Sequence, residues 1–267
     1  MSDLRVRPRD GQVIVAVTPE SAGWTYVGFE VLALAEGERV ERATGGRELC
    51  IVVVQGRCTV RSAHAEWRDV GGRATPWDGA PDAAYLPPGT ALEIEGGPVE
   101  VALCTAPARA GAPARRLPAA EARAETRGFG SQERLVTNIL MGDREADALL
   151  VTEVVTPGGH WSSYPPHKHD RDALPDETLL EETYYHRIDP AGGFGLQRVY
   201  TGDGSLDETI AFGDRDVVLV PRGYHPVSAP PGYRLYYLNV MAGPVRAWAF
   251  ANDPAHEWTS YPPPGAG

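Results

Sequence analysis

The chain has 267 residues, of which 42% are hydrophobic, enough to build a sizeable core and to exclude wholesale disorder. Its 25 basic and 36 acidic residues give a net charge of −11, which would repel a phosphate backbone, so no nucleic-acid partner is expected. No apolar run approaches the roughly 20 residues of a membrane helix, and the polar start has no apolar signal core. We therefore expect a cytoplasmic protein with no membrane contact.

The chain carries 30 glycines and 24 prolines, and turn residues separate short apolar runs along most of its length. This pattern favours an all-β fold with few short helices. Predicted strands are Gln12–Val17, Thr25–Leu34, Arg47–Gln55, Cys58–Ser62, Ala83–Leu86, Ala91–Glu95, Val99–Cys104, Leu135–Leu140, Leu149–Thr156, Thr183–Ile188, Phe194–Tyr200, Val217–Val220, His225–Ser228, Arg234–Val240 and Ala247–Phe250.

A stretch rich in Pro, Ala and Arg, Ala106–Arg127, interrupts the strand pattern. Its prolines prevent one continuous helix, although a short helix over Ala119–Thr126 fits the residues that follow them. We interpret it as a connection, which predicts an N-terminal unit over 1–105, a linker over 106–127 and a C-terminal unit over 128–267.

The two halves have strands and turns in a similar order. Glu48 stands at the start of a predicted strand that ends in a turn, and Glu182 stands at the start of the matching strand in the second half. Later, the run Tyr85–Gly89 mirrors Leu219–Gly223, each a strand entering a proline–glycine turn. These matches predict duplication of one β unit, and therefore two similar β-barrel halves, with a single larger sandwich as the alternative.

Three cysteines, Cys50, Cys58 and Cys104, lie among apolar or strand-forming neighbours. An odd number without a CxxC pair argues against a disulfide framework or a structural zinc site. We predict that all three are packing residues.

Five of the seven histidines lie between residues 160 and 225. His167 and His169 are two apart, so on an extended chain both imidazoles point to the same side. Glu182 follows on a predicted strand, and His225 comes just after a tight turn. Three imidazoles and one carboxylate, with positions left for water or substrate, form a competent site for a divalent metal ion.

The order HxH, then Glu, then a distant Pro-x-Gly-x-His resembles the two metal motifs of the cupin superfamily. Five longer segments resemble, more specifically, the 5-deoxy-glucuronate isomerase family, which comprises bicupins of bacterial myo-inositol catabolism. The resemblance is dense between residues 128 and 258, and no comparable signature occurs over 1–105. The matching segments are Ser162–Asp170, Leu180–Arg187, Gln197–Tyr200, Asp216–Pro226 and Tyr236–Pro244.

The resemblance implies a bicupin, two tandem jelly-roll barrels, with one divalent metal ion held by the C-terminal barrel. Zinc is the expected ion, with manganese, iron, cobalt or nickel as alternatives. An inserted loop before the carboxylate leaves Glu177 and Glu181 as rivals of Glu182, which is chosen because the family's metal-binding Glu directly precedes an x-Tyr strand. The N-terminal half has no HxH and is expected to have lost its metal site. The predicted ligands are His167, His169, Glu182 and His225.

A second departure from the general cupin pattern is Arg215, which stands where a glycine usually opens the second motif. We expect it to alter the turn without affecting His225.

The family resemblance implies an aldose–ketose isomerase that converts 5-deoxy-D-glucuronate to 5-dehydro-2-deoxy-D-gluconate through a metal-bound enediolate. Proton transfer by a base between C2 and C1 is favoured over a hydride shift, with Glu181, His186 and Tyr184 as candidate catalytic residues. Candidates for binding the substrate carboxylate are Arg198, Lys168 and Arg187.

Two other functions fit the same pattern: a metal-dependent dioxygenase, and a sugar-acid-binding bicupin without enzymatic activity. Oxygen uptake with substrate would favour the first. The expected partner is a small sugar acid, and a homo-oligomer is compatible with the sequence.

Overall fold

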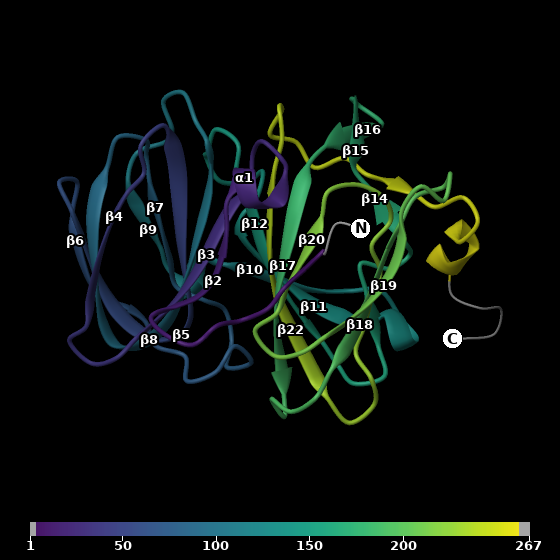
Figure 1. The fold of residues 1–267 in the computed structure, drawn as a ribbon, viewed down its shortest axis with the longest axis horizontal. Helices are drawn as coiled ribbons and strands as arrows, with labels where there is room; N and C mark the ends of the chain where they lie inside the picture. Colours follow the sequence, from purple (N-terminus) through teal and green to yellow (C-terminus); the bar gives the residue numbers. More distant parts are fainter. Residues whose placement is uncertain (1–3, 262–267) are drawn as a thin grey trace.

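The computed structural model describes residues 4–261 and shows two β units side by side (Figure 1). Apart from β1, the purple and blue strands form the N-terminal unit, and the green and yellow strands form most of the C-terminal unit. In the described residues the α-helical content is one short helix, α1 (Pro19–Ala22). Three 3₁₀ turns are η1 (Ala119–Glu121), η2 (Gly130–Gln132) and η3 (Glu257–Ser260). The predicted all-β bicupin fold is confirmed.

One curled antiparallel sheet makes the N-terminal unit. Its two longest strands, β5 and β8, pair along almost their whole length and bend together, so the other strands attach to different parts of them. The strands are β2 (Val13–Val17), β3 (Gly28–Leu34), β4 (Arg39–Ala43), β5 (Arg47–Ser62), β6 (Glu66–Gly71), β7 (Ala83–Leu86), β8 (Ala91–Pro107) and β9 (Arg115–Leu117).

Gly56 makes the bend in β5 possible. Its φ is +83°, and a Cβ there would lie 2.1 Å from the carbonyl oxygen of Pro98 on β8. The β5–β8 register shifts at this point, as expected where a bulge turns a sheet corner. A side chain larger than hydrogen would force the two strands apart.

The C-terminal unit has two larger sheets. The first has the order β1-β20-β17-β22-β12-β11-β10, and the second has the order β13-β21-β18-β19. The first comprises β1 (Arg5–Val6), β10 (Arg123–Arg127), β11 (Arg134–Leu140), β12 (Leu150–Thr156), β17 (Glu181–Asp189), β20 (Val217–Val220) and β22 (Arg234–Ala242). The second comprises β13 (Trp161–Ser162), β18 (Gly195–Tyr200), β19 (Asp207–Phe212) and β21 (Val227–Ser228).

Two short antiparallel pairs complete the C-terminal unit: β14 (His167–Lys168) with β23 (Ala251–Asn252), and β15 (Asp170–Ala173) with β16 (Glu177–Leu179). The β15–β16 hairpin is the loop inserted between the HxH motif and Glu182. Arg215, at the expected glycine position, has a φ of +66°, so this residue keeps the left-handed backbone that a glycine favours.

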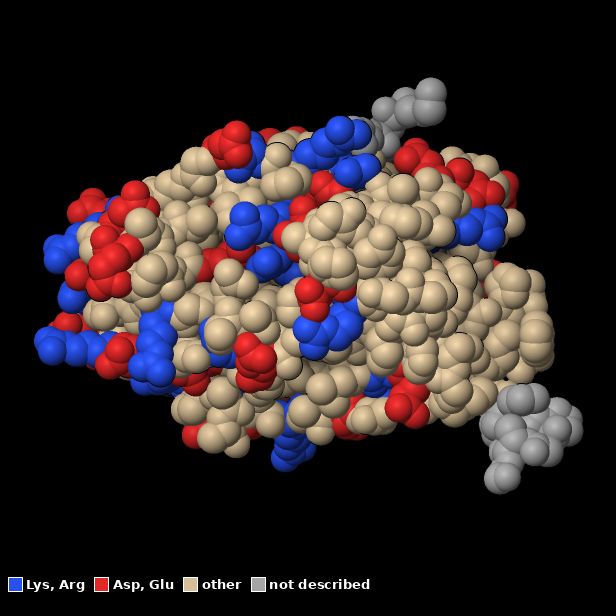
Figure 2. Space-filling model, turned by 90° about the horizontal axis from the view of Figure 1, so that it is seen from below, with Lys and Arg blue, Asp and Glu red and all other residues tan. Residues whose placement is uncertain are grey.

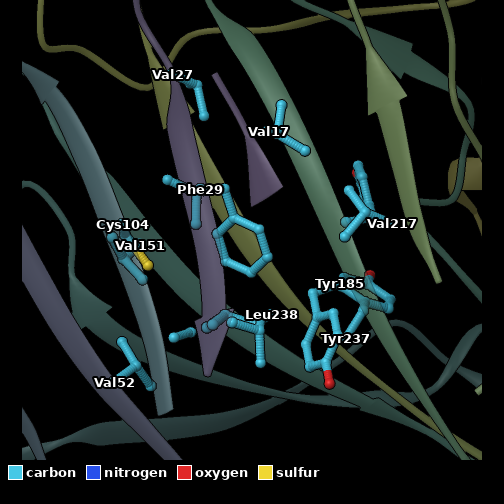
Figure 3. Packing of buried hydrophobic residues seen from close by; sticks show 14 of the residues in the cluster. Val17, Val27, Phe29, Val52, Cys104, Val151, Tyr185, Val217, Tyr237 and Leu238 are labelled. Carbon is cyan, nitrogen blue, oxygen red and sulfur yellow. The ribbon is translucent and has the colours of Figure 1, made fainter. Parts of the chain in front are cut away.

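The two units share one hydrophobic core. Phe29 and Cys104 of the N-terminal unit belong to the same buried cluster as Val151, Tyr185 and Leu238 of the C-terminal unit (Figure 3). A second cluster fills the N-terminal barrel itself. The run Leu49–Val54 is apolar at every position because alternate side chains face these two clusters. All three cysteines are buried and free, which confirms the packing prediction.

Two glutamates join the units reciprocally. The carboxylate of Glu181, on β17, accepts backbone N–H bonds from Thr25, Tyr26 and Val27 at 2.6, 2.6 and 2.9 Å. The carboxylate of Glu48, on β5, accepts three from residues 147, 148 and 149 at 2.8, 2.7 and 2.6 Å. Each unit therefore anchors a loop of the other on one buried charge.

The predicted linker is ordered, and its strands divide between the two units. β9 pairs with β7 of the N-terminal unit, and β10 pairs with β11 of the C-terminal unit. The short helix expected over Ala119–Thr126 is wrong, because only Ala119–Glu121 forms a 3₁₀ turn before β10 begins. At the other end of the first half, β1 pairs with β20 of the C-terminal unit.

Two of the strands that the sequence missed, β4 and β6, are rich in exposed and charged side chains. β4 and β6 lie at the outer end of the N-terminal unit, where acidic and basic side chains alternate (left end of Figure 2). Arg61 there bonds Glu93 and Glu95 at 2.9 and 2.5 Å.

Conversely, the strand expected over Ala247–Phe250 is absent, and β23 begins at Ala251. Within residues 4–261 no helix is long and apolar enough to cross a membrane.

Candidate metal centre

His169, Glu182 and His225 form a buried cluster inside the C-terminal barrel. One potential ligand atom from each lies within 4.8 Å of the others, and none of the three side chains is more than 2% exposed. The Nε2 atoms of His169 and His225 lie 3.1 and 3.2 Å from the same carboxylate oxygen, Oε2 of Glu182. Residues from a loop, strand β17 and a turn thus converge on one point.

The other ring nitrogens are fixed by backbone carbonyls. Nδ1 of His169 lies 3.1 Å from the oxygen of Leu180, and Nδ1 of His225 lies 2.8 Å from that of Gly223. Carbonyl oxygens only accept, so each Nδ1 carries the proton and, in a neutral ring, each Nε2 presents a lone pair. Two lone pairs and a carboxylate facing one another favour a cation among them.

The electrostatics differ between the two rings. Burial, with the neighbouring charges of His167 and His169, holds the pKa of His225 well below its usual value. Burial also lowers the pKa of His169, but hydrogen bonding and attraction to Glu182 outweigh it and leave that pKa raised. Within residues 4–261, Oε1 of Glu182 and Nε2 of His225 are buried without a hydrogen-bond partner, so the site fits a metal ion that would satisfy both.

His167 lies beside the triad but outside it. Its ring centroid is 4.9 Å from that of His225 and 4.8 Å from that of Phe250. Its Nδ1 lies 3.2 Å from the oxygen of Pro165, and its Nε2 has no hydrogen-bond partner among the residues that the structure describes. Burial and the neighbouring His169 lower the pKa of His167 to about 3, so the ring is neutral and able to bind a metal.

A cavity adjoins the triad and is lined by Glu182, Tyr184 and Tyr237, among others. Ser163 lies at its wall with a φ of +48°, unusual for a residue with a side chain. Its Oγ is 2.9 Å from the hydroxyl of Tyr184 and 3.5 Å from that of Tyr237. The strained backbone places a third hydroxyl between two tyrosines.

Of the three predicted catalytic residues, only Tyr184 lines this cavity. Burial, with the charge of Glu182, raises the pKa of Tyr184 well above its usual value, so its hydroxyl keeps its proton. Glu181 points to the opposite side of β17, where it holds the N-terminal loop. His186 lies deeper in the barrel, stacked 3.6 Å from Phe212, and contacts Gln197.

None of the three predicted carboxylate-binding residues lines the cavity, and each is paired with a carboxylate of the protein. Lys168 bonds Glu177 at 2.7 Å and Asp170 at 2.5 Å, because strand alternation turns it away from the histidines beside it. Arg187 pairs with Glu100 and Asp214. Arg198 pairs with Asp207 in solvent.

Arg134 and Arg127 are basic residues that line the cavity but were not predicted from the sequence, and Ser163 was not predicted either. The predicted strand Leu135–Leu140 begins one residue after Arg134, whereas the observed strand begins at Arg134. Alternation places Arg134 on the same face as Val136 and Asn138. Ser163 falls within the matching segment Ser162–Asp170, but its place at the cavity depends on a left-handed backbone conformation that its residue type does not indicate.

Among the described residues, the N-terminal barrel has no metal cluster at the equivalent place. Leu49 pairs with Leu86 and Thr105, as Glu182 pairs with Val220 and Met241. Leu49 therefore stands where the metal-binding carboxylate would be. The predicted match of Glu48 with Glu182 is wrong by one residue: by register, Glu48 corresponds to Glu181, and both bind a loop of the other unit.

Fold and site together define a bicupin whose C-terminal barrel contains a buried His–Glu–His cluster able to hold a metal ion. The model of the KduI/IolB family matches residues 4–259, and the chain belongs to this family.

Relatives match over nearly the whole length. The chain is 53% identical to the 5-deoxy-glucuronate isomerase of Geobacillus kaustophilus, covering 94% of this chain and 92% of the relative. It is 46% identical to that of Bacillus subtilis strain 168, covering 97% and 98%.

Two solved structures are also similar. The IolB-like protein of Salmonella typhimurium LT2 superposes with a TM-score of 0.95 at 44% identity, covering 97% of this chain and all of that one. An oxalate decarboxylase of Bacillus subtilis superposes with a TM-score of 0.66 at 13% identity, covering 94% and 80%, which shows a shared fold.

Proposed function

We propose that this protein is a 5-deoxy-glucuronate isomerase of inositol catabolism, which converts 5-deoxy-D-glucuronate to 5-dehydro-2-deoxy-D-gluconate. The observation that carries this proposal is the full-length match, at 46 and 53% identity, to two isomerases of that name. The reaction moves hydrogen from C2 to C1 and from O2 to O1, so it needs no oxidant or reductant. The buried triad and its hydroxyl-lined cavity suit such chemistry.

We propose that His169, Glu182 and His225 hold one divalent ion and that His167 supplies a fourth ligand. Nitrogen and oxygen donors with an open position suit zinc, the ion we expect, as well as manganese, iron, cobalt or nickel. When bound, the ion would act as a Lewis acid toward the C1 carbonyl and the C2 hydroxyl.

Tyr184 is the proposed proton-transfer residue. Its protonated hydroxyl can donate to the carbonyl oxygen O1, and the same group can then accept the proton that leaves C2. The reverse pair of transfers at O2 and C1 gives the ketose. Ser163 supports the role because its Oγ, 2.9 Å away, can pass protons to and from the phenol. Glu181 and His186 lie outside the cavity and are less suited to this role.

The metal requirement is tested on the purified protein. We expect about one equivalent of divalent metal per chain, isomerisation of 5-deoxy-D-glucuronate, loss of activity on chelation, and recovery when metal is restored. Elemental analysis and an assay of ketose formation measure this. Full activity after complete removal of metal would contradict the metal assignment, and no turnover by the metal-loaded protein would contradict the proposed activity.

Tyr184→Phe removes the proposed proton carrier while keeping the ring. We expect kcat to fall about 10²–10⁴-fold, with metal content unchanged. In D₂O the wild-type protein should place deuterium at the former C1 of the product, because a proton held on a hydroxyl exchanges with solvent. NMR of the product measures this. Deuterium-free product together with an active Tyr184→Phe variant would favour a hydride shift instead.

Two further expectations, a cytoplasmic location and a homo-oligomer, stay predictions.

A further inference from the structure

We infer that Arg134 binds the carboxylate of the sugar-acid substrate, at the end of the cavity away from the reacting carbons. This inference rests on the proposed function, because it takes the substrate to be an aldose with a carboxylate at C6. It assigns a recognition role to a residue outside the metal cluster and outside the three basic residues predicted from the sequence.

Arg134 begins strand β11 and faces the inside of the barrel. Val136 and Asn138, two and four residues further along, share its face, and all three line the cavity that also contains Glu182 and His167. A ligand in this cavity would therefore meet the guanidinium of Arg134 and the metal cluster at the same time.

The guanidinium has no carboxylate partner in the part of the chain that the structure describes. Its one hydrogen bond to protein is from Nη1 to the backbone oxygen of Gln132, at 3.1 Å. Four other half-buried arginines also lack an ion pair, but each makes two or three hydrogen bonds to the protein: Arg47, Arg115, Arg144 and Arg246. Arg134 is thus a partly desolvated cation with unused donors, an arrangement that favours an anionic ligand.

The neighbouring residues strengthen this preference. Arg127 pairs with Arg134 across β10 and β11 and also lines the cavity, but its charge is shared with Glu125. Gly128 allows the close approach of the guanidinium: a Cβ there would lie 2.7 Å from Nη1 of Arg134. The chain therefore makes room for a cation at this wall of the cavity, and no residue between 4 and 261 supplies its counter-ion.

The chemistry of the substrate fits two separate contacts. The reacting carbons C1 and C2 and the carboxylate at C6 are at opposite ends of the six-carbon chain. A planar guanidinium binds a carboxylate through two parallel hydrogen bonds, which fixes orientation as well as position. Anchoring C6 at Arg134 would direct the aldehyde end toward the triad and select acids over neutral sugars.

The test compares two substrates and three variants. The substrates are 5-deoxy-D-glucuronate and 5-deoxy-D-glucose, which has a hydroxymethyl group in place of the carboxylate. For Arg134→Met we expect kcat/KM on the acid to fall about 100-fold, mostly through KM, with less than about a threefold change on the neutral sugar. Arg134→Lys keeps the charge without the planar fork, so about a tenfold loss is expected. Arg234→Met, at an exposed ion pair with Asp189, is the matched control and should change neither.

Circular dichroism and metal content first establish that each variant is folded and loaded. An unchanged KM for the acid in Arg134→Met, or an equal loss on both substrates, would overturn the role of Arg134 alone. If Arg134→Met does not fold, Arg134→Lys decides, because an unchanged acid-to-neutral preference there overturns the inference. Failure of the wild-type protein to isomerise the acid would instead overturn the proposed function.

Discussion

Replacing Glu182 with glutamine is expected to remove the metal ion and almost all isomerase activity while the barrel stays folded. Oε2 of Glu182 is the atom toward which both His169 and His225 point, and the side chain is 1% exposed. An amide is a far weaker ligand than a carboxylate and cannot balance a divalent charge. Loss of Lewis-acid assistance worth several kcal/mol corresponds to about a thousandfold or greater loss of turnover.

The rival glutamates supply the controls. Glu177→Gln and Glu181→Gln should retain about one equivalent of metal, because the carboxylate of Glu177 pairs with Lys168 and Arg171 and that of Glu181 holds a backbone loop. Elemental analysis of folded protein measures the difference. Equal loss of metal in all three variants would show that Glu182 has no special place among them.

Three of the four candidate ligands come together in the structure, and sequence reasoning could place the histidines because strand alternation and turn position are local. The choice of Glu182 over Glu177 and Glu181 rested on the family resemblance. An i, i+2 pair of histidines must share a side of an extended chain, and the glutamate and third histidine lie at a strand and a turn that the residues mark. The triad of His169, Glu182 and His225 follows, whereas His167 lies just outside it.

The substrate-binding and catalytic candidates were harder to predict because they depend on what each side chain contacts across the fold. Arg187 and Lys168 are close to the site in sequence, yet each is paired with carboxylates. Glu181 is adjacent to a ligand but points to the other unit. Sequence proximity cannot distinguish a cation such as Arg134, which has no carboxylate partner among residues 4–261, from a neutralised one.

Much of the fold was predictable for the same local reason. Strands buried on one or both faces, such as Leu49–Val54 within β5, carry an apolar signal. In β4 and β6 many side chains are charged and exposed, so the apolar pattern that marks a buried strand is weak there. The division of the linker between two sheets depends on distant partners, which no local pattern records.

Glu48 and Glu181, each of which binds a loop of the other unit, are expected to stabilise the joint between the two units. Glu48→Ala should lower the free energy of unfolding by about 3–5 kcal/mol, because it leaves the N–H groups of residues 147–149 and the hydroxyl of Tyr85 without their shared acceptor. Glu181→Ala should cost somewhat less, about 2–4 kcal/mol, because two of its three donors are only part-buried. Urea unfolding of the metal-loaded protein measures both.

Glu36→Ala, at an exposed turn position of the N-terminal unit, is the control and should change stability by less than about 0.5 kcal/mol. Because the two glutamates anchor opposite loops on one continuous core, the transition of each variant should stay a single step at a lower urea midpoint. If both alanine variants unfold at the wild-type midpoint, the six backbone bonds do not stabilise the joint. If the transition separates into two, the units fold independently and the shared core does not couple them.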